Sequence, residues 1–105
     1  MPPINDAADA IARFREIRKR IGFGSAPGER LTASRGQKRH MLAIIKESFM
    51  PREYEMCIRA GKYSELDSAG ECWIVSVDLG GMLGGQVACF DTDGRLLCAW
   101  YVPEG

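Results

Sequence analysis

The first segment of the chain has the hydrophobic spacing of an amphipathic helix. Acidic residues gather at its start and basic residues at its end, an arrangement that complements the helix dipole. Gly22 follows the last apolar position, and glycine is typical of a helix C-terminus. We therefore predict an N-terminal helix within residues 1–22, with an apolar stripe of Ile11, Phe14, Ile17 and Ile21.

The next part of the chain changes from loop-like to helical patterning. Residues 23–33 contain two glycines and a proline, which predicts a flexible connection. Ser34 followed by Gln37 three positions later is a capping-box pattern. We predict helices over residues 34–61, interrupted at Pro51, which ends one helix and can open a short third one.

An alternating pattern replaces the helical one from Glu71 onward. One face of this segment carries large apolar side chains, namely Trp73, Val75, Val77 and Leu79. A turn at residues 92–94 separates two further apolar runs and predicts a hairpin. The sequence therefore predicts three antiparallel strands between residues 71 and 102.

The hairpin turn also predicts a register. A three-residue loop pairs Phe90 with Leu96 and Ala88 with Cys98, which places Cys89 and Cys98 on opposite faces of the sheet. The more apolar face is then expected against the helices, and it holds Phe90, Leu96, Cys98, Trp100 and Val102.

The opposite face of the last strand is also apolar, because it carries Leu97, Ala99 and Tyr101. A sheet covered on one side only would present polar residues there. Either a helix or a second copy of the chain is expected to cover this face, so a homodimer is one expectation.

These patterns together predict one α+β domain over residues 1–105, with two or three N-terminal helices packed on a C-terminal three-stranded antiparallel β-meander. The hydrophobic fraction of 46% and the charged fraction of 27% suit a globular chain. The N-terminus does not read as a secretory signal, and the longest apolar run is far shorter than the ~20 residues of a membrane-spanning helix. We expect a cytoplasmic protein without membrane contact.

Little in the sequence points to catalysis or to a bound group. The cysteines lack the close pairs of a zinc site, and they are expected to be buried thiols: Cys57, Cys72, Cys89 and Cys98. His40 is the only histidine, and nothing local places a nucleophile beside it. We expect no catalytic residue, no metal and no cofactor.

Charge is distributed unevenly along the neutral chain. Residues 1–48 hold ten Lys/Arg against five Asp/Glu, whereas residues 49–105 hold four against nine. Arg35, Lys38 and Arg39 lie at the start of a predicted helix, where the dipole disfavours cations unless an anion is bound. These three residues are candidates for contact with an anion or a nucleic acid. An ordinary solvated face, or one paired with the acidic half of the chain, is favoured over both an acidic partner and a nucleic acid.

The loop before the second strand of the sheet contains two large apolar residues, Met82 and Leu83, between Gly-Gly pairs. A loop tip is normally polar, so this pair either folds back onto the core or anchors a partner.

These observations favour a small non-catalytic interaction domain, such as an inhibitor, immunity protein, adaptor or regulator. It would bind an unknown protein partner through Met82, Leu83, Leu97 and Tyr101. One alternative is nucleic-acid binding by the basic N-terminal half. A further alternative is a small-molecule binder or enzyme with an aromatic pocket lined by Trp73, Trp100, Tyr54 and Tyr101.

Overall fold

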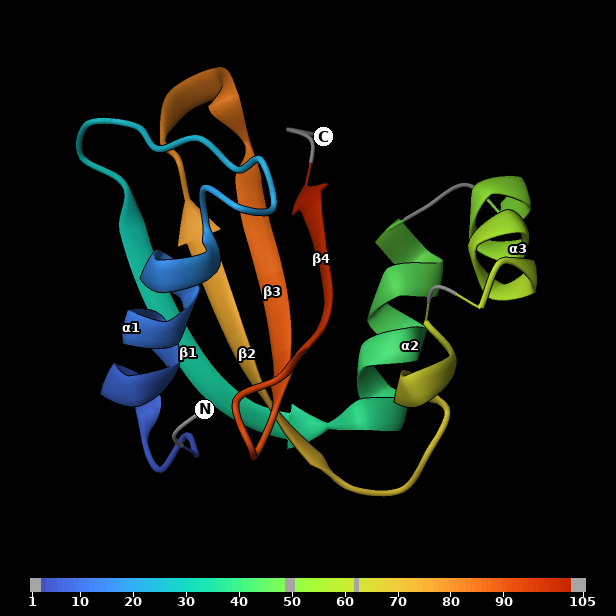
Figure 1. The fold of residues 1–105 in the computed structure, drawn as a ribbon. Helices are drawn as coiled ribbons and strands as arrows, with labels where there is room; N and C mark the ends of the chain where they lie inside the picture. The colour runs from blue at the N-terminus through green and yellow to red at the C-terminus, as the bar shows by residue number, and fades with distance from the viewer. Residues whose placement is uncertain (1–2, 49–50, 62, 103–105) are drawn as a thin grey trace.

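The computed structural model of the protein describes residues 3–48, 51–61 and 63–102, and it is an α+β structure (Figure 1). The described helices are α1 (Ala7–Ile17), α2 (Lys38–Ser48) and α3 (Pro51–Arg59), with short 3-10 turns η1 (Ser64–Leu66) and η2 (Gly81–Leu83). The strands are β1 (Arg30–Gln37), β2 (Glu71–Asp78), β3 (Gly85–Asp91) and β4 (Leu96–Val102). The predicted mixture of helices and antiparallel strands is confirmed.

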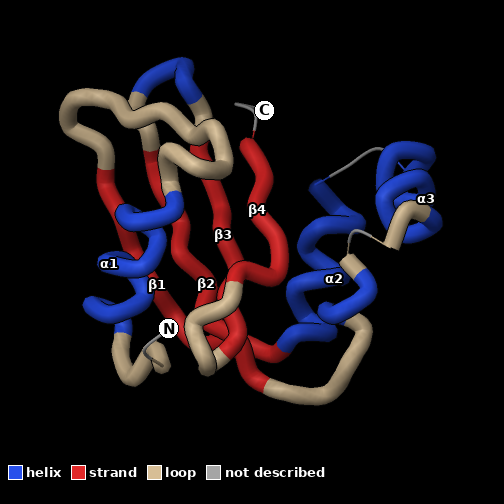
Figure 2. Tube along the Cα trace, viewed as in Figure 1, coloured by secondary structure: helices blue, strands red, loops and turns tan. Residues whose placement is uncertain are grey.

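The four strands form one antiparallel meander in the order β1-β2-β3-β4. Helix α1 packs on one face of this sheet, and α2 with η1 packs on the other; α3 lies outside α2, away from the strands (Figure 2). The predicted arrangement of helices on one face of three strands is therefore wrong in detail. The apolar second face is covered by a helix of the same chain.

The additional strand, β1, occupies the end of the predicted connection and the start of the predicted second helix. Ser34 and Gln37 are not a helix cap, because both lie in β1 and pair with β2 residues. All eight residues of β1 pair with β2, and this long-range pairing outweighs the local capping pattern. Gly36 suits the position, because a side chain there would meet Ile74 Cδ1 at 2.7 Å.

A β-bulge changes the predicted register of the last hairpin. The backbone N–H of Asp91 donates to the carbonyl of Arg95 at 2.9 Å, and Phe90 pairs with Leu96, as predicted. The register then shifts by one residue, so that Cys98 lies directly opposite Cys89. The prediction that these two cysteines lie on opposite faces is wrong, because the bulge inserts one extra residue into β4.

The remaining elements agree closely with the hydrophobic pattern. The Asp6 side chain caps α1 by accepting from the backbone N–H of Asp9 at 2.8 Å, and Gly22 has the positive φ of a chain reversal. Helix α3 begins at Pro51, as predicted.

The core consists of two apolar layers, one on each side of the sheet. The layer under α1 contains Phe14, Ile17, Trp73, Val75 and Phe90. The layer under α2 contains Met41, Ile45, Tyr63, Leu66, Trp100 and three cysteines.

Candidate functional site

One end of the sheet gathers three segments that are distant in the sequence. The strand register places Arg30, Asp78, Gly85 and Val102 side by side across the four strands. The loop 22–29, the turn η2 and the end of β4 therefore meet at this end, which is the upper edge in Figure 1. We call it the loop end.

Exposed apolar side chains are concentrated at the loop end. Five large hydrophobic residues are exposed within the described chain, and two of them, Met56 and Ile58, lie on α3. The other three are Leu83, Tyr101 and Val102, with exposed fractions of 65%, 48% and 36%. We call these three, together with Phe23, which packs on Tyr101, the loop-end surface.

Leu83 lies in a turn that is held by backbone hydrogen bonds. The backbone N–H of Leu83 donates to the carbonyl of Gly80 at 3.2 Å, and the N–H of Leu79 donates to Gly84 at 3.1 Å. The Asp78 carboxylate accepts from the N–H of Gly80 at 2.9 Å, and Gly80 has a φ of 83° that other residues rarely adopt. Met82 belongs to the same turn, and its side chain is outside the described part of the structure.

Tyr101 is held in place by the loop 22–29. Its ring packs against Phe23 with centroids 4.5 Å apart and the planes tilted by 54°. Its hydroxyl accepts from the N–H of Gly24 at 3.4 Å and donates to the carbonyl of Gly22 at 3.5 Å, both at the long end of hydrogen-bond geometry. The exposed edge of this ring is thereby fixed in orientation.

A buried polar network anchors the loop 22–29 beneath this surface. The Arg18 guanidinium donates two hydrogen bonds of 2.6 Å to the Glu29 carboxylate and one of 3.1 Å to Gln86 Oε1. Gln86 Nε2 donates to the carbonyl of Gly24 at 2.8 Å, and Glu29 also accepts from the N–H of Ala26 at 3.1 Å. The hydrogen bonds from Arg18 lower the pKa of Glu29 to about 2.

This network could not be predicted from the amino-acid sequence. The one feature of the sequence that hints at it is Gln86, a polar residue at a buried position of β3. A groove of about 430 Å³ adjoins the network, and its lining includes Arg18 and Glu29 as well as Arg15, Lys19 and Phe23.

Leu97, the remaining predicted protein-contact residue, lies apart from the loop-end surface. It is partly buried and packs against the layer under α2. The bulge in β4 separates it from the face that holds Tyr101, so among the predicted contact residues whose side chains are described, only Leu83 and Tyr101 lie at the loop end.

The three basic candidates are divided between a strand and a helix. Arg35 lies in β1, where it forms an exposed ion pair of 3.0 Å with Glu71 and lies over the Trp73 ring at 5.4 Å. Lys38 and Arg39 are the first two residues of α2, and the first turn of this helix contains no acidic residue. Arg35 is therefore paired with a residue of the acidic half of the chain.

Three of the cysteines form a row across β2, β3 and β4, which we call the thiol row: Cys72, Cys89 and Cys98. A hydrogen bond with Cys89 and burial raise the pKa of the Cys72 thiol far above its usual range. For Cys89, the bond to Cys72 lowers the pKa, but the bond to Cys98 and burial outweigh it and the net direction is upward. Such thiols are protonated and weakly nucleophilic at neutral pH. No group of residues suited to hold a metal ion occurs in the described ranges.

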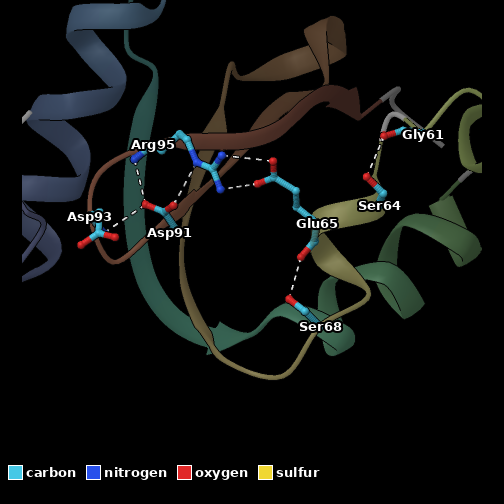
Figure 3. A network of polar contacts seen from close by, with 7 residues as sticks. All are labelled: Gly61, Ser64, Glu65, Ser68, Asp91, Asp93 and Arg95. Atoms are coloured by element: carbon cyan, nitrogen blue, oxygen red, sulfur yellow. Dashed lines mark hydrogen bonds and ion pairs between the residues drawn. The ribbon is translucent and has the colours of Figure 1, made fainter.

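The opposite end of the sheet is closed by polar contacts instead of apolar ones (Figure 3). Arg95 donates to the Glu65 carboxylate at 2.5 and 3.1 Å and to Asp91 Oδ2 at 3.2 Å. Asp91 Oδ1 also accepts from the backbone N–H groups of Arg95 and Asp93. This network joins η1 to the β3–β4 turn, and its exposure makes it a modest contributor to stability.

The four residues predicted to line an aromatic pocket do not share one. Trp73 belongs to the layer under α1, and Trp100 belongs to the layer under α2. Tyr54 lines a separate groove beside α3, while Tyr101 lies at the loop end. This prediction is wrong, because successive strand residues point to opposite faces and the two faces are covered by different helices.

The fold and the site define a mixed α+β domain in which helices cover both faces of a four-stranded antiparallel meander. Comparison with known protein families, with curated proteins and with solved structures finds no match to the chain. Among the described residues, no helix is both long enough and apolar enough to span a membrane.

Proposed function

We propose that the protein is a non-catalytic interaction domain that binds a partner protein through the loop-end surface. The observation that carries the proposal is the gathering of Leu83, Tyr101 and Val102, from two separate chain segments, at one end of the sheet. Both faces of the sheet are already covered by helices, so these side chains have no core to fill. Exposed apolar groups that cluster in this way are typical of interaction sites.

The rigidity of the surface supports the proposal. Leu83 is held by a hydrogen-bonded turn, and Tyr101 is held by Phe23 and two backbone groups. A pre-ordered surface loses little conformational entropy when a partner binds, so more of the contact energy appears as affinity. Tyrosine is also among the residues enriched at the energetic centres of interfaces.

The charges near the surface favour an acidic partner. Lys19 and Arg20 are exposed at the end of α1, next to the loop that carries Phe23. Neither forms an ion pair within residues 3–48, 51–61 and 63–102. We expect a partner that offers an apolar pocket bordered by carboxylates, and association that slows as salt is added.

The test uses Leu83→Ser, with Met56→Ser as the matched control. Both residues are more than 60% exposed, so neither change should alter the thermal midpoint measurably. Proteins captured from a lysate by the wild-type chain and by both variants are quantified by mass spectrometry. We expect one partner whose capture is kept by Met56→Ser and falls by at least tenfold with Leu83→Ser. Equal capture by both variants would contradict the proposal.

A second candidate function is nucleic-acid binding at the start of α2. It rests on Lys38 and Arg39, which occupy the first helical turn without an acidic neighbour in that turn. Fluorescence anisotropy with labelled duplex and single strands at about 50 mM salt tests it, because phosphate contacts are strongest at low salt. Loss of binding in a Lys38→Gln, Arg39→Gln variant would support it, and no binding by the wild-type chain would end it.

A further inference from the structure

The last strand of the sheet has an outer edge that no described strand covers. β4 is the final strand in the order β1-β2-β3-β4, and its seven residues, LLCAWYV, include no charge and no proline. Edge strands that present unpaired backbone groups are usually protected by charged residues, prolines or bulges. The bulge in β4 lies at its beginning, so Cys98–Val102 follow a regular register along β3 and form a smooth edge.

The other edge of the sheet is protected in the usual way. β1 carries Arg30 and Arg35, and its remaining residues are mostly small or polar. Gly36 also interrupts its row of side chains. The sheet therefore has one edge suited to pairing and one edge that resists it.

We propose that β4 pairs antiparallel with β4 of a second copy of the chain, which joins two sheets into one of eight strands across a twofold axis. Antiparallel self-pairing of β4 places no two like charges opposite each other in any register, because the strand has none. Its side chains are aliphatic, aromatic or thiol, so every cross-strand pair is apolar.

Pairing through β4 is expected to stop at two copies, because the dimer has no free β4 edge left. Once two β4 strands have paired, both free edges of the combined sheet are β1 edges. Pairing of β1 with β1 would bring Arg30 and Arg35 near their counterparts, which opposes further growth. The expected product is a dimer and not a fibre.

This assembly shares β4 with the proposed partner site but does not use Leu83. Strand pairing uses backbone groups of β4, including those of Tyr101 and Val102, whereas the partner site also requires the side chain of Leu83, which lies outside β4. Interfaces built mainly on one strand pair are small, so we expect a dissociation constant in the micromolar range.

The first experiment measures mass by light scattering after size exclusion over a range of concentrations. The expected limiting mass is twice 11.6 kDa. Val102→Lys places a charge on the paired edge and should give a monomer, whereas Thr32→Lys, an exposed change on β1, should leave the dimer intact. Leu83→Ser should also leave the dimer intact, so failure of the partner site and failure of the dimer are distinguishable.

Hydrogen exchange on the wild-type chain gives a second measurement that needs no variant. Amides of β4 that point away from β3 should exchange at least tenfold more slowly in concentrated than in dilute protein, and outward amides of β1 should not change. A monomer at every concentration would overturn the proposal. A dimer without added protection in β4, or one that survives Val102→Lys, would overturn it as well.

Discussion

Replacing Glu29 by glutamine tests whether the ion pair with Arg18 holds the loop 22–29 on the sheet. The change keeps the size of the side chain and an oxygen that can accept from Arg18, but it removes the negative charge. The Arg18 side chain is only 9% exposed, so its guanidinium would lose its charged partner in a largely dry position. Loss of one member of such a pair is costly, because the remaining charge is poorly solvated.

The magnitude follows from the lowered pKa of Glu29. A fall from an ordinary value near 4.5 to about 2 corresponds to roughly 3 kcal/mol of preference for the charged form in the folded state. Water reaches the carboxylate through the adjacent groove, and this screening reduces the expected loss to about 2 kcal/mol. For a domain of this size, such a loss lowers the thermal midpoint by about 10 °C.

The pH dependence distinguishes the ion pair from simple packing. Because the pKa of Glu29 is depressed in the folded state, its contribution is complete above pH ~5.5 and is lost as pH falls toward 2. Urea denaturation of the wild-type chain and Glu29→Gln at pH 7 and pH 3 should therefore show a difference that shrinks by about half or more at pH 3. Glu16→Gln is the control, since the 65% exposed Glu16 side chain should cost less than about 0.5 kcal/mol. An equal difference between wild type and Glu29→Gln at both pH values would refute this account.

Three further predictions concern the fold. Gly85→Ala should destabilise the protein by about 2 kcal/mol in urea denaturation, because the new Cβ would lie 2.6 Å from the Val77 carbonyl oxygen, which cannot move aside easily. Gly36→Ala is the control. Its new Cβ would clash only with the Ile74 Cδ1 methyl group, which can rotate away, so it should cost less than half as much. Asp6→Ala removes the cap of α1 and should lower the free energy of unfolding by about 1 kcal/mol, whereas a change within 0.2 kcal/mol would argue against the cap. An aromatic disulfide reagent should modify one thiol per folded chain and none in Cys57→Ser, since the thiol row is buried; rapid reaction of three or four thiols would show that the row is open.

Elements with a clear hydrophobic pattern of their own could be predicted from the amino-acid sequence. The apolar stripe of α1 and the alternation of β2 define which residues face the core, because burial of large side chains dominates their free energy. The start of α3 at Pro51 follows from the restricted backbone of proline. Leu83 could be named as a surface candidate because a large apolar side chain is unusual at a loop tip, and Tyr101 because it lies on the second apolar face of the last strand.

Other features depend on contacts between distant parts of the chain. β1 contains few large apolar residues, so its strand form depends on pairing with β2 and is not visible in its own pattern. The bulge in β4 moves Cys98 to the face of Cys89, and no local signal in the hairpin sequence distinguishes this register from its neighbour.

The network of Arg18, Glu29 and Gln86 likewise forms only after α1, the loop 22–29 and β3 have packed together. The loop-end surface itself has the same origin. Leu83 and Tyr101 are distant in the sequence, and they lie at the same end of the sheet because the meander places the β2–β3 turn beside the end of β4. Hydrophobic periodicity depends on residues close together in the sequence, so it can be read from the sequence alone. Strand register and buried polar pairs depend on residues far apart in the sequence, and these long-range contacts form the loop end.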